Sequence, residues 1–321
     1  MKVAKLIAFI AGALLSAPAL DAVLAADTLK LAIGQRGNWE NAAPELGQKA
    51  EIFKKHGLDL DIIYTQGGGE TQQAVISGSV DIGIGVGTGG AMGAFAKGAP
   101  LRVIGASVTG AHDLYWYVPA GSPIKTLKDA DGKTIAYSTR GSSTNSIVLG
   151  FLKQFDVAAK PVATGSPAST FTQTMSGQID VGWSSPPFGV DALQEGKIRV
   201  VARGSDLDST RDQTVRVQIA NADVLEKRRD AIARFVQAWR ETLDWMYSDP
   251  AAIKAYAEWV NTPEERARRV RDEFYPKKNL SPDQISGLDK AMAQAVEQKL
   301  LAAPLTATQL DEFIQVPKPK E

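Results

Sequence analysis

One stretch of the chain, YSTRGSSTNS at residues 137–146, places an arginine among hydroxyl side chains where a strand is expected to become a helix. The preceding KTIA at 133–136 is typical of a buried strand, and apolar residues recur at helical spacing over 147–155. A helix N-terminus has N–H groups without partners and a partial positive charge, so it either caps itself with a hydroxyl or receives an anion. One Ser or Thr suffices for a cap. Both interpretations, an anion site and an elaborate cap, stay open at this point.

A glycine-rich segment, GVGTGG at residues 85–90, matches the GxGxxG pattern of dinucleotide-binding proteins. That function would also need an acidic residue at the end of the next strand to hold the ribose. The next strand, LRVIGA at 101–106, supplies none. We therefore interpret these glycines, and Gly67, Gly68 and Gly69 after the preceding strand, as places where the backbone passes close to another object.

The candidate ligand-binding residues follow strands in both halves of the chain, because open α/β sheets bind ligands beyond the carboxyl ends of their parallel strands. They are Gln35, Arg36, Asn38, Trp39, Gly68, Gly69, Gly87, Thr88, Arg140, Gly141, Ser142, Ser143, Thr144, Ser184, Ser185 and Pro186.

Two arginines in this set, Arg36 and Arg140, are expected on opposite lobes, where each could grip a carboxylate, sulfonate or phosphate with two hydrogen bonds. Either could instead pair with a nearby acid such as Glu40 or Glu70. Trp39 follows a polar loop, which favours the cleft over the core, whereas Trp183 is expected to be packed. An aromatic surface beside Arg36 would suit an organic anion better than a bare inorganic ion.

The elements that must position these residues alternate between strands and helices. Strands are expected at 29–33, 59–64, 80–84 and 101–106, and helices at 45–55, 71–77 and 91–97. This alternation predicts a parallel sheet with helices on both faces.

A repeat, SGSVDIG at 77–83 and SGQIDVG at 176–182, indicates two similar α/β lobes. From Val224 onward the pattern is helical, with helix starts predicted at Asp249-Pro250, Thr262-Pro263 and Ser281-Pro282; the last two fit a capping box. The basic run at 266–271 is expected to be a solvated helix face.

The N-terminus has the pattern of a secretory signal peptide: MKVAK, an apolar run over 6–20, and Val23-Leu24-Ala25 with small residues before a cut after Ala25. We expect export to a bacterial periplasm. The chain has no cysteine, which excludes disulfides, thiolate metal sites and a lipid-modified cysteine. Its 36 basic and 36 acidic residues leave no net positive charge to attract nucleic acid, and its two histidines are few ligands for a metal site.

Taken together, the sequence resembles the periplasmic solute-binding proteins of ABC importers, in the group that includes sulfonate, taurine, nitrate and thiamine-precursor binders. The resemblance rests on the signal peptide, the SGSVDIG segment and four further stretches. These stretches are FKKHGLDLDI at 53–62, AFAKGAPLRVIG at 94–105, KTLKDADGKTIAYSTRGSS at 125–143 and WRETLDWMYSDP at 239–250.

The resemblance implies a type II periplasmic binding protein fold, with two Rossmann-like α/β lobes joined by two crossover strands and a ligand cleft between them. After the signal peptide (1–25), lobe one would comprise 26–112 and 213–321, and lobe two 113–212. In such proteins the loop at 140–144 commonly receives the ligand's anionic group.

The implied function is that of a binding protein, not an enzyme, which delivers a small organic anion (sulfonate or carboxylate) to an ABC permease and ATPase without cofactor or metal. A neutral pyrimidine or thiamine precursor is the alternative ligand. A periplasmic enzyme is less favoured, because GxSxG is absent and the chain lacks the cysteine-rich segment of the related enzyme that makes the thiamine pyrimidine.

Overall fold

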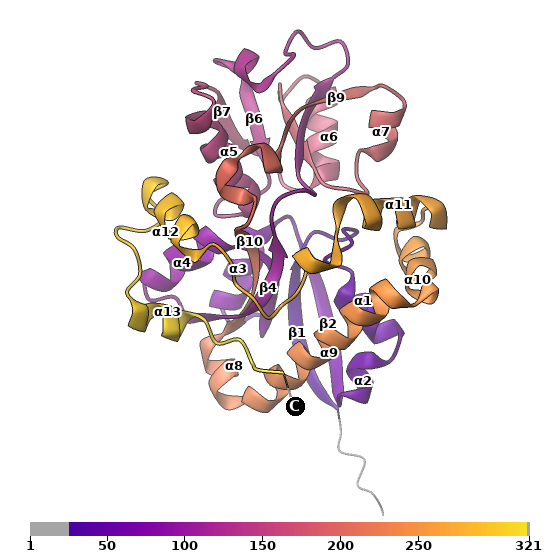
Figure 1. The fold of residues 1–321 in the computed structure, drawn as a ribbon, viewed down its shortest axis with the longest axis vertical. Coiled ribbons are helices and arrows are strands. Elements are labelled where there is room, and N and C mark those ends of the chain that lie inside the picture. The colour runs from indigo at the N-terminus through magenta and orange to yellow at the C-terminus, as the bar shows by residue number, and fades with distance from the viewer. Residues whose placement is uncertain (1–25, 320–321) are drawn as a thin grey trace, which may run out of the picture.

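The computed structural model describes residues 26–319 and places two α/β lobes one above the other (Figure 1). The strands are β1 (Asp27–Gly34), β2 (Leu58–Thr65), β3 (Ile82–Gly87), β4 (Leu101–Thr109), β5 (Tyr115–Pro119), β6 (Thr134–Tyr137), β7 (Lys160–Ala163), β8 (Gly182–Ser184), β9 (Ile198–Arg203) and β10 (Thr214–Asn221). The α-helices are α1 (Ala43–Lys49), α2 (Ile52–Lys55), α3 (Gly68–Ile76), α4 (Thr88–Ala96), α5 (Ser143–Gln154), α6 (Pro167–Met175), α7 (Val190–Gln194), α8 (Ala222–Lys227), α9 (Arg229–Ser248), α10 (Pro250–Val260), α11 (Glu264–Phe274), α12 (Leu288–Glu297) and α13 (Ala307–Phe313). Short 3-10 helices span Leu127–Ala130, Gly204–Asp206, Asp208–Thr210 and Lys277–Asn279.

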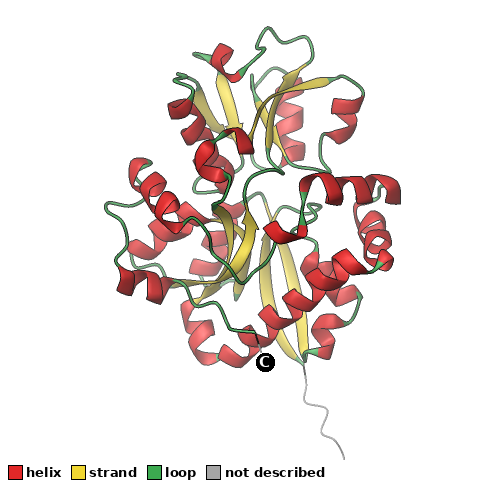
Figure 2. Cartoon of the chain, viewed as in Figure 1, coloured by secondary structure: helices red, strands yellow, loops and turns green. Residues whose placement is uncertain are grey.

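The lower sheet has five strands in the order β2-β1-β3-β10-β4. Helices flank its strands, as Figure 2 shows. β1 is parallel to β2 and β3, whereas β10 is antiparallel to both of its neighbours. The four strands for which a parallel sheet was predicted therefore run in one direction, as expected, and β10, which that prediction did not include, runs against them. The reason is that β10 returns from the upper lobe and enters the sheet at the end where the other strands leave it.

The upper lobe has a three-stranded sheet, β8-β5-β9, and a parallel pair, β6-β7, which are linked by a bridge between Ile135 and Val181. The chain leaves the lower sheet after β4 and returns to it at β10. We propose to keep the lobe boundaries at 112/113 and 212/213, within these two connecting segments.

The repeated sequence has the same structural role in each lobe. Gly78 and Gly177 both have a positive φ (73° and 77°), which glycine adopts without strain. The carboxylate of Asp81 accepts a backbone N–H of β1 at 2.9 Å, and that of Asp180 accepts a backbone N–H of β6 at 2.9 Å. Each lobe thus positions the entry of its central strand with the same aspartate, and the prediction of two similar lobes is confirmed.

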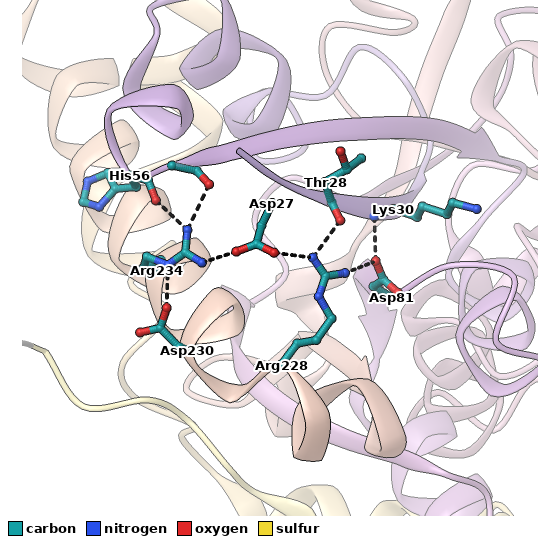
Figure 3. Close-up of polar contacts among 9 residues, drawn as sticks. Asp27, Thr28, Lys30, His56, Asp81, Arg228, Asp230 and Arg234 are labelled. Atoms are coloured by element: carbon teal, nitrogen blue, oxygen red, sulfur yellow. Dashed lines mark hydrogen bonds and ion pairs between the residues drawn. The ribbon is translucent and has the colours of Figure 1, made fainter. Parts of the chain in front are cut away.

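Arginine side chains from the C-terminal helical region hold the start of β1 in place (Figure 3). Arg228 contacts both Asp27 (3.2 Å) and Asp81 (3.4 Å), and Arg234 pairs with Asp27 and donates to the His56 carbonyl at 2.9 Å. The hydrogen bond from Arg234 holds the pKa of Asp27 below its usual value. This network lies at the end of β1 opposite to the loops that face the upper lobe, so we assign it a structural role.

The helix starts in the C-terminal region are predicted with mixed success. Asp249 caps α10 by accepting the Ala251 N–H at 2.8 Å, as expected. α11 begins at Glu264 but has no side-chain cap. No helix begins at Ser281, because the segment packs against strands instead: the Pro282 carbonyl accepts a β4 N–H at 2.9 Å, and α12 starts only at Leu288.

Among residues 26–319, no helix is long and apolar enough to cross a membrane. The predicted signal peptide at 1–25 lies outside the described residues.

Candidate functional site

A small pocket lies where the two lobes meet. It has a volume of about 20 Å³, enough for one water molecule. Its lining comes from both lobes and from Leu114 in the connecting segment after β4: Gly34, Gln35, Glu40, Asn41, Gly68, Gly85, Leu114, Ser138, Ser142, Ser143, Thr144, Trp183 and Arg216.

The lower wall of the pocket is built from loops at the carboxyl ends of strands. Gln35 follows β1 and has a φ of 84°, a left-handed conformation that non-glycine residues rarely adopt and that is often found at functional sites. The amide nitrogen of Asn41 donates to the carbonyls of Gly34 and Gln35 at 2.8 and 3.2 Å. This pair of bonds fixes the side chain of Asn41 and leaves its Oδ1 without a partner in the described part of the chain.

The upper wall is the N-terminus of α5, where the sequence had placed a helix start. Ser142 is the N-cap and accepts the Asn145 N–H at 3.2 Å, and Thr144 Oγ1 accepts the Ser138 N–H at 2.9 Å. The hydroxyl of Ser143 lines the pocket and makes no hydrogen bond within residues 26–319. Most of the hydroxyl cluster therefore organises the turn itself, and the Ser143 hydroxyl is the one of Ser142, Ser143 and Thr144 that has no partner among the described residues.

The glycine-rich loops of the lower lobe form its contact with this turn. The Gly69 N–H donates to Thr139 Oγ1 at 2.9 Å across the lobes. A Cβ on Gly87 would lie 2.6 Å from the Gly141 carbonyl oxygen, and one on Gly90 would lie 2.2 Å from it. Both distances are too short for a carbon atom, so only glycine permits this approach. The object that the glycines were predicted to approach is the other lobe.

Further contacts on both flanks of the pocket hold the lobes together. On one side Arg266 of α11 pairs with Asp191 of α7 at 2.7 Å. On the other, Lys153 of α5 pairs with Glu297 of α12 at 2.5 Å. The basic run of α11, predicted to be only a solvated face, thus contributes one arginine to the contact between lobes. The two lobes of this structure are thus in contact on both flanks of the pocket.

Three charged side chains are buried beside the pocket. Arg216 of β10 contacts Asp113 at 2.6 Å and Glu40 at 3.5 Å, and each of the three is at most 8% exposed. Burial raises the pKa of Glu40 to about 7, with Arg216 opposing the rise and Asp113 adding to it. One guanidinium therefore serves two carboxylates.

We predict that Glu40 makes the ligand-free protein less stable as the pH rises from about 4.5 to about 7. In this range the folded state keeps a proton on Glu40 that the unfolded state has already lost, so the free energy of unfolding falls with increasing pH. This decrease in the free energy of unfolding should amount to on the order of 2–3 kcal/mol between pH 5 and pH 8, and Glu40→Gln should remove it. Urea unfolding of parent and variant across that range measures it.

The groups that face Glu40 and act on its pKa are Arg216, Asp113 and Tyr275. Glu45→Gln in α1, whose carboxylate accepts the Tyr64 hydroxyl and does not line the pocket, is the matched control. Equal slopes in parent and Glu40→Gln would contradict the assignment.

Residues 45–253 match the family described as NMT1/THI5 like. The chain belongs to this family. A curated relative from Escherichia coli (strain K12), named "Putative aliphatic sulfonates-binding protein", is 27% identical over 171 residues, which are 51% of this chain and 52% of the relative. The chain thus spans about half the length of the curated relative it matches.

Solved structures share the fold of this NMT1/THI5-like chain. The alkanesulfonate-binding protein SsuA from Xanthomonas axonopodis pv. citri bound to MOPS has a TM-score of 0.74 at 18% identity, over 90% of this chain and 98% of that one. The periplasmic aliphatic sulphonate binding protein SsuA from Escherichia coli has a TM-score of 0.69 at 21% identity, over 92% and 94%. The desulfurization enzyme DSZB has a TM-score of 0.63 at 16% identity, over 90% and 96%. The predicted type II binding-protein fold is confirmed.

Five of the ligand-binding residues predicted from the sequence line this pocket: Gln35, Gly68, Ser142, Ser143 and Thr144. Others lie at the contact between lobes. They are Gly69, Gly87, the backbone of Arg140 and Gly141, and the pair of Asn38 and Ser185, whose side chains meet at 2.5 Å.

Several expected residues lie away from the pocket. Trp39 is fully buried in the lower core, with its ring 4.8 Å from that of Tyr256, so we remove it from the site. Arg36 stacks over Trp259 at 4.8 Å and does not line the pocket. The remaining three residues make hydrogen bonds within the protein. The hydroxyl of Thr88 donates to the Thr214 carbonyl, and that of Ser184 donates to the Phe188 carbonyl. The backbone carbonyl of Pro186 accepts from the Tyr275 hydroxyl.

Sequence reasoning missed Glu40, Asn41 and Arg216 as site residues and expected Trp183 to be packed. Trp183 is buried in the upper core and still lines the pocket. One signal was available for Arg216: a charged residue in TVRVQIAN, an otherwise apolar strand, has to find a buried partner. Nothing local pointed to Asp113 and Glu40 as those partners.

Proposed function

We propose that this protein is the solute-binding component of an ABC importer, and that it binds a small organic anion, a sulfonate or carboxylate, between its lobes. The observation that carries the proposal is the N-terminus of α5, which lines the pocket with the free hydroxyl of Ser143. Backbone N–H groups, the helix dipole and hydroxyls together solvate an anion that has lost its water. Arg140, exposed on the same loop and without an ion pair among the described residues, adds positive charge at the rim.

The names of similar proteins support this proposal, since they bind aliphatic sulfonates or alkanesulfonates. The role implies an ABC permease and ATPase as partners and the periplasm as location. The lobes must separate to admit a ligand, because the closed pocket has room only for a water molecule. Hinge motion about the two connecting segments would achieve this.

A neutral pyrimidine or thiamine precursor remains the second candidate ligand. The observation that favours it is the pair of acceptors in the pocket, Glu40 Oε2 and Asn41 Oδ1, which have no partner within residues 26–319. An aminopyrimidine could donate to both.

The anion site predicts that Ser143→Ala weakens binding of ethanesulfonate or propanoate by roughly 10-fold to 150-fold, the loss of one hydrogen bond to a charged group. Calorimetric titration of the purified protein measures this. A thermal-shift screen finds the concentration range, since a ligand at about 100 times its dissociation constant adds roughly 2.7 kcal/mol.

The control is Ser146→Ala, one turn further along α5, whose side chain does not line this pocket. It should bind like the parent. If both variants bind the anion as the parent does, or if only uncharged pyrimidines stabilise the protein, the anion-site proposal is wrong.

A further inference from the structure

A second cavity lies between the lobes, on the flank of the molecule where α7 and α11 meet (Figure 1). Its volume is about 110 Å³. One wall comes from α11 of the lower lobe, and the other comes from β5, α7 and the end of β9 in the upper lobe. None of its lining residues lines the small pocket described above, so the two are separate sites.

The inner part of this cavity is apolar. Val190 and Val270, one from each lobe, are at most 9% exposed, and Phe274 lies beside them. Tyr115 offers its ring, because its hydroxyl already donates to the Phe188 carbonyl at 2.6 Å. An engineered cavity of roughly 150 Å³ holds benzene, so a cavity of about 110 Å³ has room for an apolar group of about four carbon atoms.

Three arginines, Arg203, Arg266 and Arg269, supply positive charge at the cavity. Arg266 contacts Asp191 at 2.7 Å through Nη1, and Arg269 contacts Glu273 at 3.2 Å through Nε, so each guanidinium keeps further N–H groups for another partner. The guanidinium of Arg203 has no ion pair and no hydrogen bond among the residues that the structure describes. Two carboxylates thus face three arginines, and one positive charge is left uncompensated.

We propose that this cavity is a second ligand site, which takes a short-chain aliphatic carboxylate with its chain between the two valines and its acid group on the arginines. A guanidinium binds a carboxylate through two parallel N–H bonds, and the apolar wall removes the chain from water. Arg203 belongs to the upper lobe and Arg269 to the lower lobe, so the bound acid contacts both and favours their contact. The small volume suits a free molecule better than a segment of a partner protein.

Calorimetric titration of the protein purified from the full chain with pentanoate at pH 7.5 tests this proposal, in low salt because the arginines at the rim are exposed. Arg203→Gln and Arg269→Gln, one in each lobe, should each weaken binding about tenfold or more, the value of a charged hydrogen bond. Gln194→Glu, which places a negative charge at the exposed rim, should also weaken binding. 1-Pentanol, which has the same chain without the charge, should bind more weakly than pentanoate.

Two comparisons locate the binding. Every titration is repeated with Ser143→Ala in the background, because this variant weakens an anion at the small pocket and leaves the second cavity intact. Arg268→Gln is the matched control, since Arg268 is exposed on α11 and does not line the cavity. It should bind pentanoate like the parent. Gln194→Glu and the comparison with 1-pentanol keep the test valid if an arginine variant fails to fold.

The outcomes separate this proposal from the proposed function. Pentanoate binding that survives Ser143→Ala and falls in Arg203→Gln, Arg269→Gln and Gln194→Glu supports the second site, whether or not sulfonates bind the small pocket. Binding that is lost in Ser143→Ala alone overturns the second site and leaves the proposed function standing. An effect of Arg203→Gln without one of Arg269→Gln overturns the contact with both lobes. Equal losses in Arg268→Gln and Arg203→Gln, equal affinity for pentanoate and 1-pentanol, or no binding of pentanoate overturns the carboxylate site.

Discussion

Arg216→Met should lower the free energy of unfolding at pH 7.5 by about 3–5 kcal/mol, the largest stability effect expected of a single charge in this protein. The arginine is buried against Asp113 at 2.6 Å and Glu40 at 3.5 Å, and methionine leaves both carboxylates without a cation. The loss should shrink as the pH falls toward 5, because protonation of Glu40, whose pKa burial raises to about 7, then removes one of the uncompensated charges. Urea unfolding at both pH values measures it.

A triple variant, with Glu40→Gln and Asp113→Asn added to Arg216→Met, should recover much of the loss, since it leaves no buried charge at this place. The control is Arg211→Met, whose ion pair with Asp208 is exposed and should contribute less than about 1 kcal/mol. If Arg216→Met and Arg211→Met cost the same, the buried cluster has no special energetic role.

Gly90→Ala should keep the two lobes folded and prevent them from closing. Gly90 is in α4, where alanine is a better helix former by about 1 kcal/mol. Its Cβ, however, would lie 2.2 Å from the carbonyl oxygen of Gly141 in the other lobe. The closed state therefore becomes less favourable by an estimated 1–3 kcal/mol, the usual cost of overpacking, and affinity for a ligand that needs closure falls roughly 5-fold to 150-fold.

Gly89→Ala is the matched control, because the nearest atom to its Cβ would be a leucine methyl at 3.5 Å, an ordinary contact. X-ray scattering should show a larger radius of gyration for Gly90→Ala than for Gly89→Ala or the parent. Titration with ethanesulfonate supplies the affinities. An unchanged radius together with unchanged binding would show that closure does not depend on this contact.

The local features of the fold were predictable because they follow from neighbouring residues. The alternation of strands and helices, the start of α5 at its hydroxyl cluster, the positive φ of Gly78 and Gly177, and the cap at Asp249 depend on periodicity and on backbone groups a few positions away. The helix start predicted at Ser281 is the exception, because contacts from distant parts of the chain decide the structure there. Its capping signal is real, but hydrogen bonds to distant strands outweigh a local preference.

The site was predictable only in part. The rule that ligands lie beyond the carboxyl ends of strands located Gln35, Gly68 and the start of α5. The rule names the loop and not the direction of each side chain in it. Trp39 and Glu40 are adjacent in one loop, yet Trp39 is packed in the core and Glu40 lines the pocket.

By itself, then, the sequence determined a two-lobed α/β architecture and a helix start at the hydroxyl cluster of 142–144, since both depend on short-range hydrogen bonding and hydrophobic periodicity. Tertiary structure decided what faces that helix start. Glu40, Asp113 and Arg216 meet at one place from three segments of the chain, and the glycines at 87 and 90 find their partner at Gly141 in the other lobe. The physical reason is that burial removes water from these groups, and each must then find its charge or hydrogen-bond partner wherever the fold brings one within reach.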